Sequence, residues 1–250
     1  MPEALLETRG LAKRFGGLTA TDDVSLSIVP GELHAVIGPN GAGKTTLVAQ
    51  LAGELAPDAG AILFAGEDIT RLTTPERAAR GLARSFQVTN IFHELSVLDN
   101  VALAVQSHAG HSFRFWRAAR NEPALRRPAE ALLAELGLAA RRDLPAGFLS
   151  HSEKRTLEIA MVLATEPRLL LLDEPLAGMG PDDSKRMVQL LATLKGKTAI
   201  LLIEHDMDAV FALADRLTVL VYGRAIATGT PEAIRRDDRV RHAYLGDEEA

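Results

Sequence analysis

The stretch Gly38-Pro39-Asn40-Gly41-Ala42-Gly43-Lys44-Thr45 decides the fold of this 250-residue chain. It fits the phosphate-cradling pattern G-x-x-x-x-G-K-[ST]. A short apolar run, Leu33 to Ile37, precedes it, and an apolar-periodic stretch that begins at Leu47 follows it. The sequence therefore predicts a strand, a tight glycine loop and a helix, in which the glycine backbone and the helix N-terminus favour a bound phosphate.

The side chains of this loop predict how a nucleotide would be held. Lys44 is expected to reach the β- and γ-phosphates, and Thr45 is expected to place its hydroxyl on Mg²⁺. The other residues expected along the phosphates are Gly38, Pro39, Asn40, Gly41, Ala42, Gly43 and Thr46. A glycine-rich turn with a chance lysine is the alternative, and the flanking strand and helix patterns argue against it.

Composition and charge limit the class of protein. Hydrophobic residues make up 47% of the chain, which supports a substantial core, and the mean hydropathy is +0.05. No run approaches the roughly 20 apolar residues that span a bilayer, and the N-terminus does not read as a secretory signal. Cysteine is absent, which fits a reducing cytoplasm, and a net charge of −5 argues against a general nucleic-acid binder.

Apolar patterns predict how the rest of the chain is organised. Residues 5–32 are indicated as β-rich, because apolar and polar side chains alternate there. Thr73 followed by Glu76 predicts a helix that begins with a capping box. Residues 93–160 are indicated as mainly helical, which predicts a helical lobe, over roughly residues 90–160, inserted within the core.

Two further expectations concern breaks in helices and the end of the sheet. Pro123 and Pro128 are expected to interrupt any continuous helix in the lobe, because proline has no backbone N–H and clashes with the preceding turn. Leu217 to Tyr222 are expected to form the last strand, with a tail of helix-compatible segments beyond it.

An acid pair follows a strongly apolar run. Leu169 to Leu172 are four leucines that end in Asp173 and Glu174, which predicts a buried parallel strand with carboxylates at its C-terminal end. Ligands of open α/β sheets gather at that end. Asp173 is expected to hold the Mg²⁺ shell together with Thr45, and Glu174 to polarise the attacking water as general base. The alternative is a helix-capping or surface acid pair.

Two more polar residues are candidates for the same chemistry. Gln87 closes a short apolar segment and is expected to bond the metal or the water. His205 follows the apolar run Ala199 to Ile203 and is expected to donate to the γ-phosphate, where charge develops during transfer. Taken alone, Gln87 would be interpreted as a surface or capping residue and His205 as an ordinary interior or surface histidine. The phosphate loop and the acid pair in the same chain favour the functional interpretation of His205.

These motifs, in this order, resemble the ATP-binding subunit of ATP-binding cassette (ABC) transporters. The resemblance covers almost the whole chain and includes the signature segment Leu149–Glu153 as well as the phosphate loop, Gln87, the acid pair and His205. It implies a single ABC ATP-binding domain over residues 1–250. The implied fold is the α/β fold of P-loop NTPases: a mostly parallel core sheet, an antiparallel β subdomain and an inserted helical subdomain.

The resemblance also implies cofactors, partners and location. ATP and Mg²⁺ would be bound, and a second ABC subunit, identical or homologous, would form a head-to-tail dimer. Ser150, Ser152 and Glu153 would then face the ATP of the partner, and Phe15 would stack on adenine, although a core role for Phe15 is the alternative. Two transmembrane permease subunits, and indirectly a solute-binding protein, would be partners at the cytoplasmic face of the inner membrane. No nucleic acid would be involved.

Finer features are similar to the branched-chain amino acid importer subgroup. They are Arg14–Leu18, Arg84–Gln87, Leu157–Ala160, Asp173–Met179, Ile203–Met207, the Phe115–Arg117 insertion and Tyr244–Gly246. Urea and short-amide importers share much of this pattern, so a cargo of that kind stays open. Two further functions also stay open: a cassette protein outside transport that acts as a nucleotide-gated binding module, and a partner subunit with little hydrolysis.

The signature segment departs from the family pattern Leu-Ser-Gly-Gly-Gln. Here it reads Leu149-Ser150-His151-Ser152-Glu153, so Ser152 stands where the family has a glycine. The added Cβ and hydroxyl would either disturb the γ-phosphate or donate one more hydrogen bond to it. Slower turnover at this site and simple tolerance of the small side chain are both compatible with the sequence.

Overall fold

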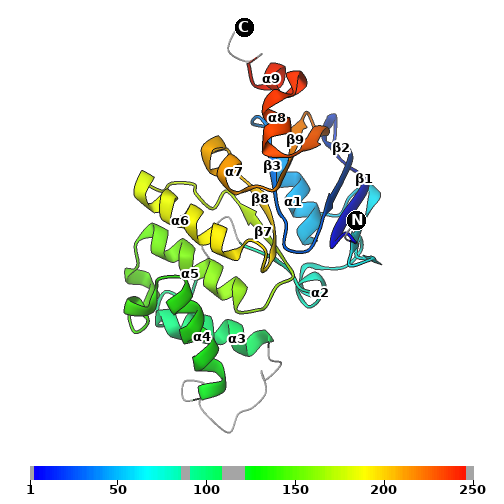
Figure 1. Cartoon of the computed structure of the whole chain (residues 1–250). Coiled ribbons are helices and arrows are strands. Elements are labelled where there is room, and N and C mark those ends of the chain that lie inside the picture. The colour runs from blue at the N-terminus through cyan, green and yellow to red at the C-terminus, as the bar shows by residue number, and fades with distance from the viewer. Residues whose placement is uncertain (1–2, 86–90, 109–121, 246–250) are drawn as a thin grey trace. The chain divides into compact units, whose positions relative to one another are not determined.

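The structure is a computed structural model, and it describes residues 3–85, 91–108 and 122–245. The chain divides into two compact units. The core unit consists of Met1–Arg84, Arg168–Leu176 and Leu191–Ala250, and the helical unit consists of Ser85–Pro167 and Ala177–Leu190. The elements of each unit can be followed by their labels in Figure 1.

A six-stranded sheet forms the centre of the core unit, in the order β10-β9-β3-β8-β7-β6. Its strands are β3 (Leu33–Ile37), β6 (Leu82–Arg84), β7 (Leu169–Asp173), β8 (Ala199–Ile203), β9 (Arg216–Val221) and β10 (Arg224–Gly229). Neighbouring strands are parallel except for β9 and β10. Every residue of β3, β7 and β8 is buried, as the near-continuous apolar runs predict for strands covered on both faces.

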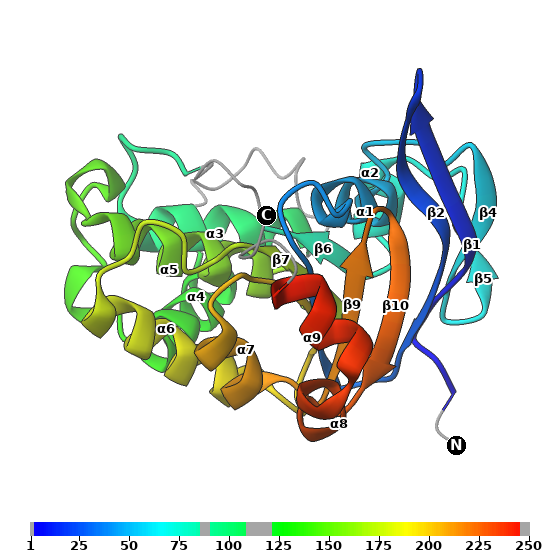
Figure 2. The same ribbon diagram turned by 90° about the horizontal axis from the view of Figure 1, so that it is seen from above.

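A second, antiparallel sheet belongs to the same unit, in the order β2-β1-β4-β5. Its strands are β1 (Leu6–Phe15), β2 (Leu18–Ile28), β4 (Ala59–Phe64) and β5 (Glu67–Asp68). Helix α1 (Lys44–Ala52) contacts β2, β6 and β7 (Figure 2). Apolar side chains of α1 and of both sheets, among them Leu11, Leu47 and Leu171, form one hydrophobic cluster. The predicted fold class is confirmed.

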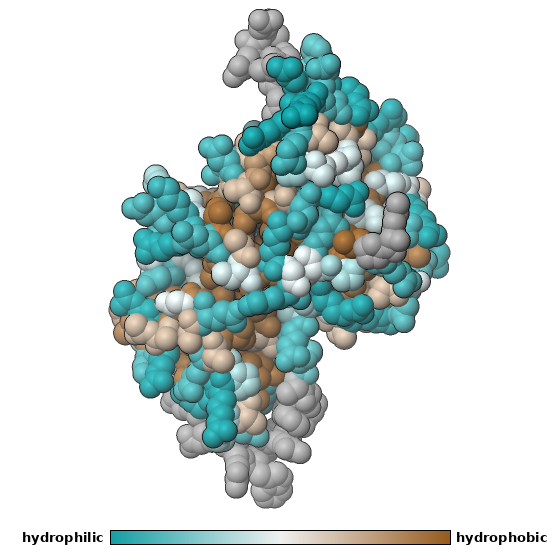
Figure 3. Space-filling model, viewed as in Figure 1, coloured by the Kyte–Doolittle hydropathy of each residue, from teal (hydrophilic) through white to brown (hydrophobic). Residues whose placement is uncertain are grey.

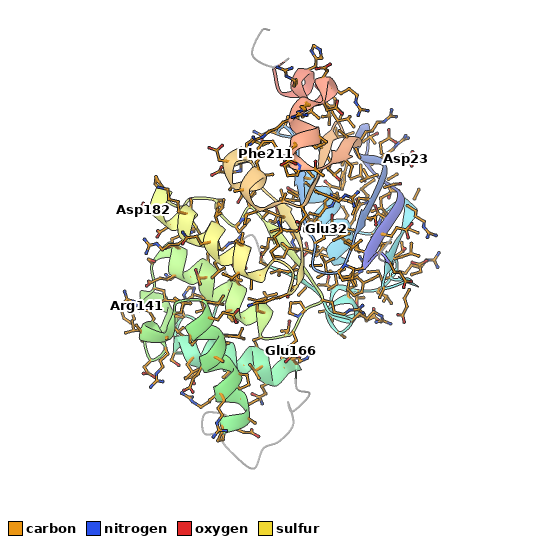
Figure 4. The ribbon with its side chains drawn as sticks, viewed as in Figure 1. Asp23, Glu32, Arg141, Glu166, Asp182 and Phe211 are labelled. Atoms are coloured by element: carbon orange, nitrogen blue, oxygen red, sulfur yellow. The ribbon has the colours of Figure 1, made fainter. Side chains whose placement is uncertain are left out.

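Short helices complete the core unit: α2 (Thr74–Ala78), α7 (Met207–Leu213), α8 (Pro231–Arg236) and α9 (Asp238–Leu245). The predicted capping box at α2 is confirmed, because Thr73 and Glu76 make both reciprocal bonds. The Arg235 guanidinium lies 4.1 Å from the ring centroid of Phe211, which is labelled in Figure 4. This cation–π contact holds α8 against α7.

A buried polar chain links three strands of the large sheet. The fully buried His34 ring lies 2.9 Å from Glu32 Oε1 and 2.8 Å from Thr218 Oγ1. Thr218 Oγ1 lies in turn 3.0 Å from Thr228 Oγ1 on β10. Burial acts to raise the pKa of Glu32, but the hydrogen bonds from His34 and Val29, together with the charge interactions with His34 and Arg216, outweigh it, so that pKa lies below its usual value. Glu32 is labelled in Figure 4.

The helical unit contains α3 (Val97–His108), α4 (Pro123–Glu135), α5 (His151–Leu163) and the part of α6 (Pro181–Leu194) up to Leu190. Two 3₁₀ turns, Ala139–Arg141 and Ala146–Phe148, connect α4 to α5. Leu98, Val101, Leu133 and Leu157 are buried members of its own hydrophobic cluster. No helix in the described ranges is long and apolar enough to cross a bilayer. Hydrophilic residues cover the face around α8 and α9 of the core unit (Figure 3).

Two expectations about element boundaries are wrong. Pro128 lies inside α4 and does not end it, because one missing N–H is tolerated where Leu125, Ala129 and Leu133 keep the apolar face buried. Pro123, by contrast, begins the helix, where its missing N–H is no loss. A further strand, β10, follows the expected last strand and pairs antiparallel with β9.

Candidate functional site

The phosphate loop connects the buried strand β3 to α1, as predicted. Gly43 is the N-cap residue of α1 and has a left-handed backbone, with φ of 99°. A Cβ on Gly43 would lie 2.0 Å from the Ala20 carbonyl oxygen, and one on Gly38 would lie 2.2 Å from that of Leu220. Both glycines are therefore needed because the loop is pressed against β2 and β9, while at Gly41 a Cβ would meet open space.

Lys44 folds its side chain over this loop. Its Nζ donates to the carbonyl oxygens of Gly38 at 2.7 Å and of Pro39 at 3.0 Å. Burial lowers the pKa of Lys44, and the charges of Glu174 and Asp173 partly oppose that shift. The ammonium group thus lies at the loop backbone, and the two predicted acids are close enough to influence it.

Asp173 and Glu174 lie at the C-terminal end of the apolar strand β7. Asp173 is the last residue of β7 and is only 1% exposed, whereas Glu174 is half-buried. Glu174 has φ of 48°, an unfavourable backbone conformation for a residue with a side chain. Its N–H donates to the Ile203 carbonyl at the end of β8, at 2.9 Å. Strain of this kind is typical of functional sites, where the surrounding structure enforces it.

His205 follows β8 and is largely exposed. The preceding residue, Glu204, accepts a hydrogen bond from its backbone. The sequence patterns assign no role to Glu204. The buried Glu204 carboxylate accepts the N–H of Leu176 at 2.8 Å and of His205 at 3.1 Å. Burial raises the pKa of Glu204, although these backbone hydrogen bonds oppose the shift. The sequence does carry a signal for Glu204, since it is an acid at the end of an apolar strand, like Asp173.

The signature residues lie in the helical unit, at the start of α5. Ser150 is the N-cap, and its capping box with Glu153 has both reciprocal bonds, at 3.2 and 2.9 Å. Ser152 Oγ lies 3.1 Å from Ser150 Oγ. Glu153 also pairs with Arg141, labelled in Figure 4, at 3.0 Å. The Ser150 N–H is the main cause of the lowered pKa of Glu153, so this carboxylate serves the helix start.

Of the remaining candidate residues, Phe15, Thr45 and Thr46 lie in the described part of the chain. Phe15 ends β1 and is 50% exposed, with Lys13 Nζ 5.8 Å from its ring centroid, so it is not a core residue. Thr45 is exposed in the first turn of α1, and Thr46 beside it is half-buried. Gln87 and the Phe115–Arg117 insertion lie outside the described residues.

The oxygen donors of the core unit suit a magnesium ion that is bound together with a nucleotide. In the part of the chain that the structure describes, they do not form a site in which the protein supplies all the metal ligands. No group of three or more His, Cys, Asp or Glu side chains among the described residues is arranged to hold a metal. Asp173 and Thr45 offer a carboxylate and a hydroxyl oxygen, the hard ligands that Mg²⁺ takes together with substrate phosphates. Mg²⁺ bound with a nucleotide is therefore compatible with these residues.

A phosphate loop that opens a helix, beside parallel strands that end in acids, defines a P-loop nucleotide-binding protein. The family profile described as "ABC transporter" matches residues 21–177. The high-affinity branched-chain amino acid transport ATP-binding protein LivG of Escherichia coli K12 is 39% identical, over 99% of this chain and 100% of LivG. The chain therefore belongs to the ABC transporter family, as one of its ATP-binding ATPase components, among the LivG and BraF group.

Other comparisons agree with that assignment. BraF of Pseudomonas aeruginosa is 38% identical over 99% of this chain and 100% of its own length. A profile described as "Branched-chain amino acid ATP-binding cassette transporter" matches residues 226–250. The crystal structure of the ADP conformation of MJ1267, an ATP-binding cassette of an ABC transporter, has a TM-score of 0.85 at 31% identity and covers 98% of this chain and 99% of MJ1267.

Proposed function

We propose that this chain hydrolyses Mg²⁺–ATP to power an importer of branched-chain amino acids. The observation that carries the proposal is the phosphate loop with Lys44 beside the strand-end acids Asp173 and Glu174. The names of LivG and BraF, which match over their full lengths, support the cargo. The alternative cargo is urea or a short amide.

Each candidate residue has its own role in the proposed reaction. The loop amides and Lys44 bind the β- and γ-phosphates. Thr45 and Asp173 hold Mg²⁺, with Gln87 as a further ligand, and the ion when bound neutralises charge on the phosphates. Glu174 takes the proton of the attacking water, and His205 donates a hydrogen bond to the γ-phosphate.

Assembly would turn hydrolysis into movement. In the proposed head-to-tail dimer, Ser150 and Ser152 of one subunit approach the ATP held by the phosphate loop of the other. ATP then stabilises the closed pair, and its hydrolysis removes that preference, because a ligand shifts an equilibrium only by its differential affinity for the two states. Two permease subunits supply the path, and a solute-binding protein delivers cargo to them. The assembly places this chain at the cytoplasmic face of the inner membrane.

The test of hydrolysis uses two matched glutamates. Glu174 and Glu166 both have a left-handed backbone, with φ of 48° and 51°, but Glu166 is an exposed residue of the helical unit. Glu174→Gln is expected to lower ATPase at least about 100-fold while ATP binding persists, because a general base contributes about 10²- to 10⁴-fold. Glu166→Gln is expected to change little. Wild-type turnover by Glu174→Gln would contradict the proposal.

The cargo requires a transport assay. Membrane vesicles that contain this chain with its permeases and binding protein are expected to take up labelled leucine only when ATP is supplied. Uptake of labelled urea without leucine uptake would replace the proposed cargo and leave the ATPase proposal intact.

A further inference from the structure

Arg84 lies between two carboxylates of the core unit. It is the last residue of β6, and its Nη2 donates to Asp173 Oδ2 at 3.0 Å. Its Nη1 donates to Glu54. The Arg84 side chain is 9% exposed and that of Asp173 1%, whereas that of Glu54 is 40% exposed. The ion pair between Arg84 and Asp173 is therefore shielded from solvent, whereas the pair between Arg84 and Glu54 is partly exposed.

The position of Arg84 follows from the sheet. Strands β6 and β7 are parallel, and Arg84 is paired with Leu171, so its long side chain reaches two residues further along β7 to Asp173. Glu54 comes just after α1, the helix that begins at Lys44. One guanidinium thus joins the helix of the phosphate loop to the strand that carries the proposed metal-binding acid.

Charge-assisted hydrogen bonds fix the direction of a carboxylate as well as its position. Mg²⁺ accepts only near-ideal octahedral geometry, so the orientation of a carboxylate ligand matters to its binding. Groups that orient metal ligands from behind typically change metal affinity about 10- to 100-fold when they are removed. Arg84 has the contacts of such a group, because it holds Asp173 by one oxygen, Oδ2.

We propose that Arg84 is a positioning residue that orients Asp173 for the Mg²⁺ of the bound nucleotide. The inference rests on the proposed function, since it assumes that Asp173 meets a nucleotide-bound cation. Arg84 acts through Asp173 and not on the phosphates. Its role is therefore confined to the metal step, and nucleotide binding without metal depends on the loop and Lys44.

The test measures metal binding directly, without turnover. Mn²⁺ replaces Mg²⁺, and free Mn²⁺ is followed by electron paramagnetic resonance in the presence of a non-hydrolysable ATP analogue. Arg84→Met is expected to weaken Mn²⁺ binding about tenfold or more, and Arg84→Lys, which keeps the charge but not the planar fork, to weaken it less. Binding of the analogue in EDTA is expected to stay within about threefold, because the loop is intact.

Glu54→Gln is the matched control, because it removes the exposed partner of Arg84 and leaves the pair with Asp173 in place. It is expected to leave Mn²⁺ binding unchanged, and thermal unfolding in EDTA shows whether each variant is folded. If Arg84→Met does not fold, Arg84→Lys carries the test. Unchanged Mn²⁺ affinity in the Arg84 variants would overturn the inference, and tighter binding would make Arg84 a competitor of the cation. If the wild-type chain binds no Mn²⁺ with the analogue, the proposed metal site itself fails.

Discussion

The buried carboxylate of Glu204 accepts the backbone N–H of Leu176 at 2.8 Å, although 28 residues separate them in the chain. The same carboxylate accepts the N–H of His205. Glu204 thereby joins the segment after the general-base candidate Glu174 to the segment that carries His205. Two loops at the ends of neighbouring strands are held by one side chain.

Glu204→Ala is expected to destabilise the chain by about 1–3 kcal/mol, because two N–H groups lose their acceptor in a buried place. Urea unfolding measures the change. Glu232, an exposed residue in the first turn of α8, is the control, and Glu232→Ala is expected to change the free energy of unfolding far less. Equal stability of Glu204→Ala and wild type would show that the carboxylate does not hold the two loops.

The raised pKa of Glu204 has a consequence for stability against pH. Its folded-state pKa lies above the unfolded value of 4.5, so the folded state binds more protons between these two values. The Glu204 contribution to stability therefore falls as pH rises from 4.5 through the raised pKa. Glu204→Gln does not titrate, and its stability relative to wild type is expected to rise over that window. Parallel pH profiles of the two proteins would contradict this.

Arg77 is a buried cation that caps α1 from a distant segment. Its guanidinium donates to the carbonyls of Gln50 and Leu51, each at 2.7 Å, and also to those of Thr70 and Leu72. Arg77→Met is expected to destabilise the chain by at least about 2 kcal/mol, because these carbonyls lose their donors.

The control for Arg77 is the exposed Arg80, which lies 3.5 Å from Glu67. Arg80→Met is expected to cost about 0.5 kcal/mol or less, since surface ion pairs contribute little. Chemical unfolding of both variants gives the comparison. A similar loss in the two proteins would mean that Arg77 is not the helix cap inferred from its contacts.

Phe15 is exposed enough to stack on a nucleotide base. Phe15→Ala is expected to weaken ATP binding by about 5- to 150-fold, because stacking of a base on an aromatic ring contributes about 1–3 kcal/mol. Phe15→Tyr is expected to retain the affinity. The neighbouring Leu18, 67% exposed and paired with Phe15 across the hairpin, provides the control variant Leu18→Ala. Equal ATP affinity of Phe15→Ala and wild type by calorimetry would remove the proposed stacking.

Ser152 is expected to slow the proposed composite site. Its hydroxyl contacts the Ser150 hydroxyl, which the dimer would present to the γ-phosphate. Ser152→Gly is therefore expected to raise the ATPase rate of the assembled transporter, and Ser152→Ala separates the effect of the hydroxyl from that of the Cβ. An unchanged rate in Ser152→Gly would show that the serine is simply tolerated.

The parts of the site that sequence predicts are local ones. The phosphate loop and the acids after β7 are each contained in one short segment, and their flanking apolar runs indicate which end of a strand they occupy. The capping box at Thr73 and Glu76 is equally local. Such features need no knowledge of distant partners, and the structure has the strand, loop and helix in the expected places.

The parts that sequence does not predict depend on distant partners. Arg84 and Asp173 are 89 residues apart, and Arg77 caps carbonyls 26 and 27 residues away. Nothing in the neighbourhood of either arginine indicates which distant groups it contacts. The strand β10 is not predicted for the same reason. Its segment is short and weakly apolar, and it is recognisable as a strand only from its pairing with β9.

The most direct test of the central claim is a crystal structure of the Glu174→Gln chain grown with ATP and Mg²⁺. We expect the triphosphate against residues 38–45, with Lys44 Nζ moved from the carbonyls of Gly38 and Pro39 to the phosphates, and the cation between Thr45 and Asp173. A nucleotide bound elsewhere, or a loop without phosphate and Lys44 still on those carbonyls, would contradict it.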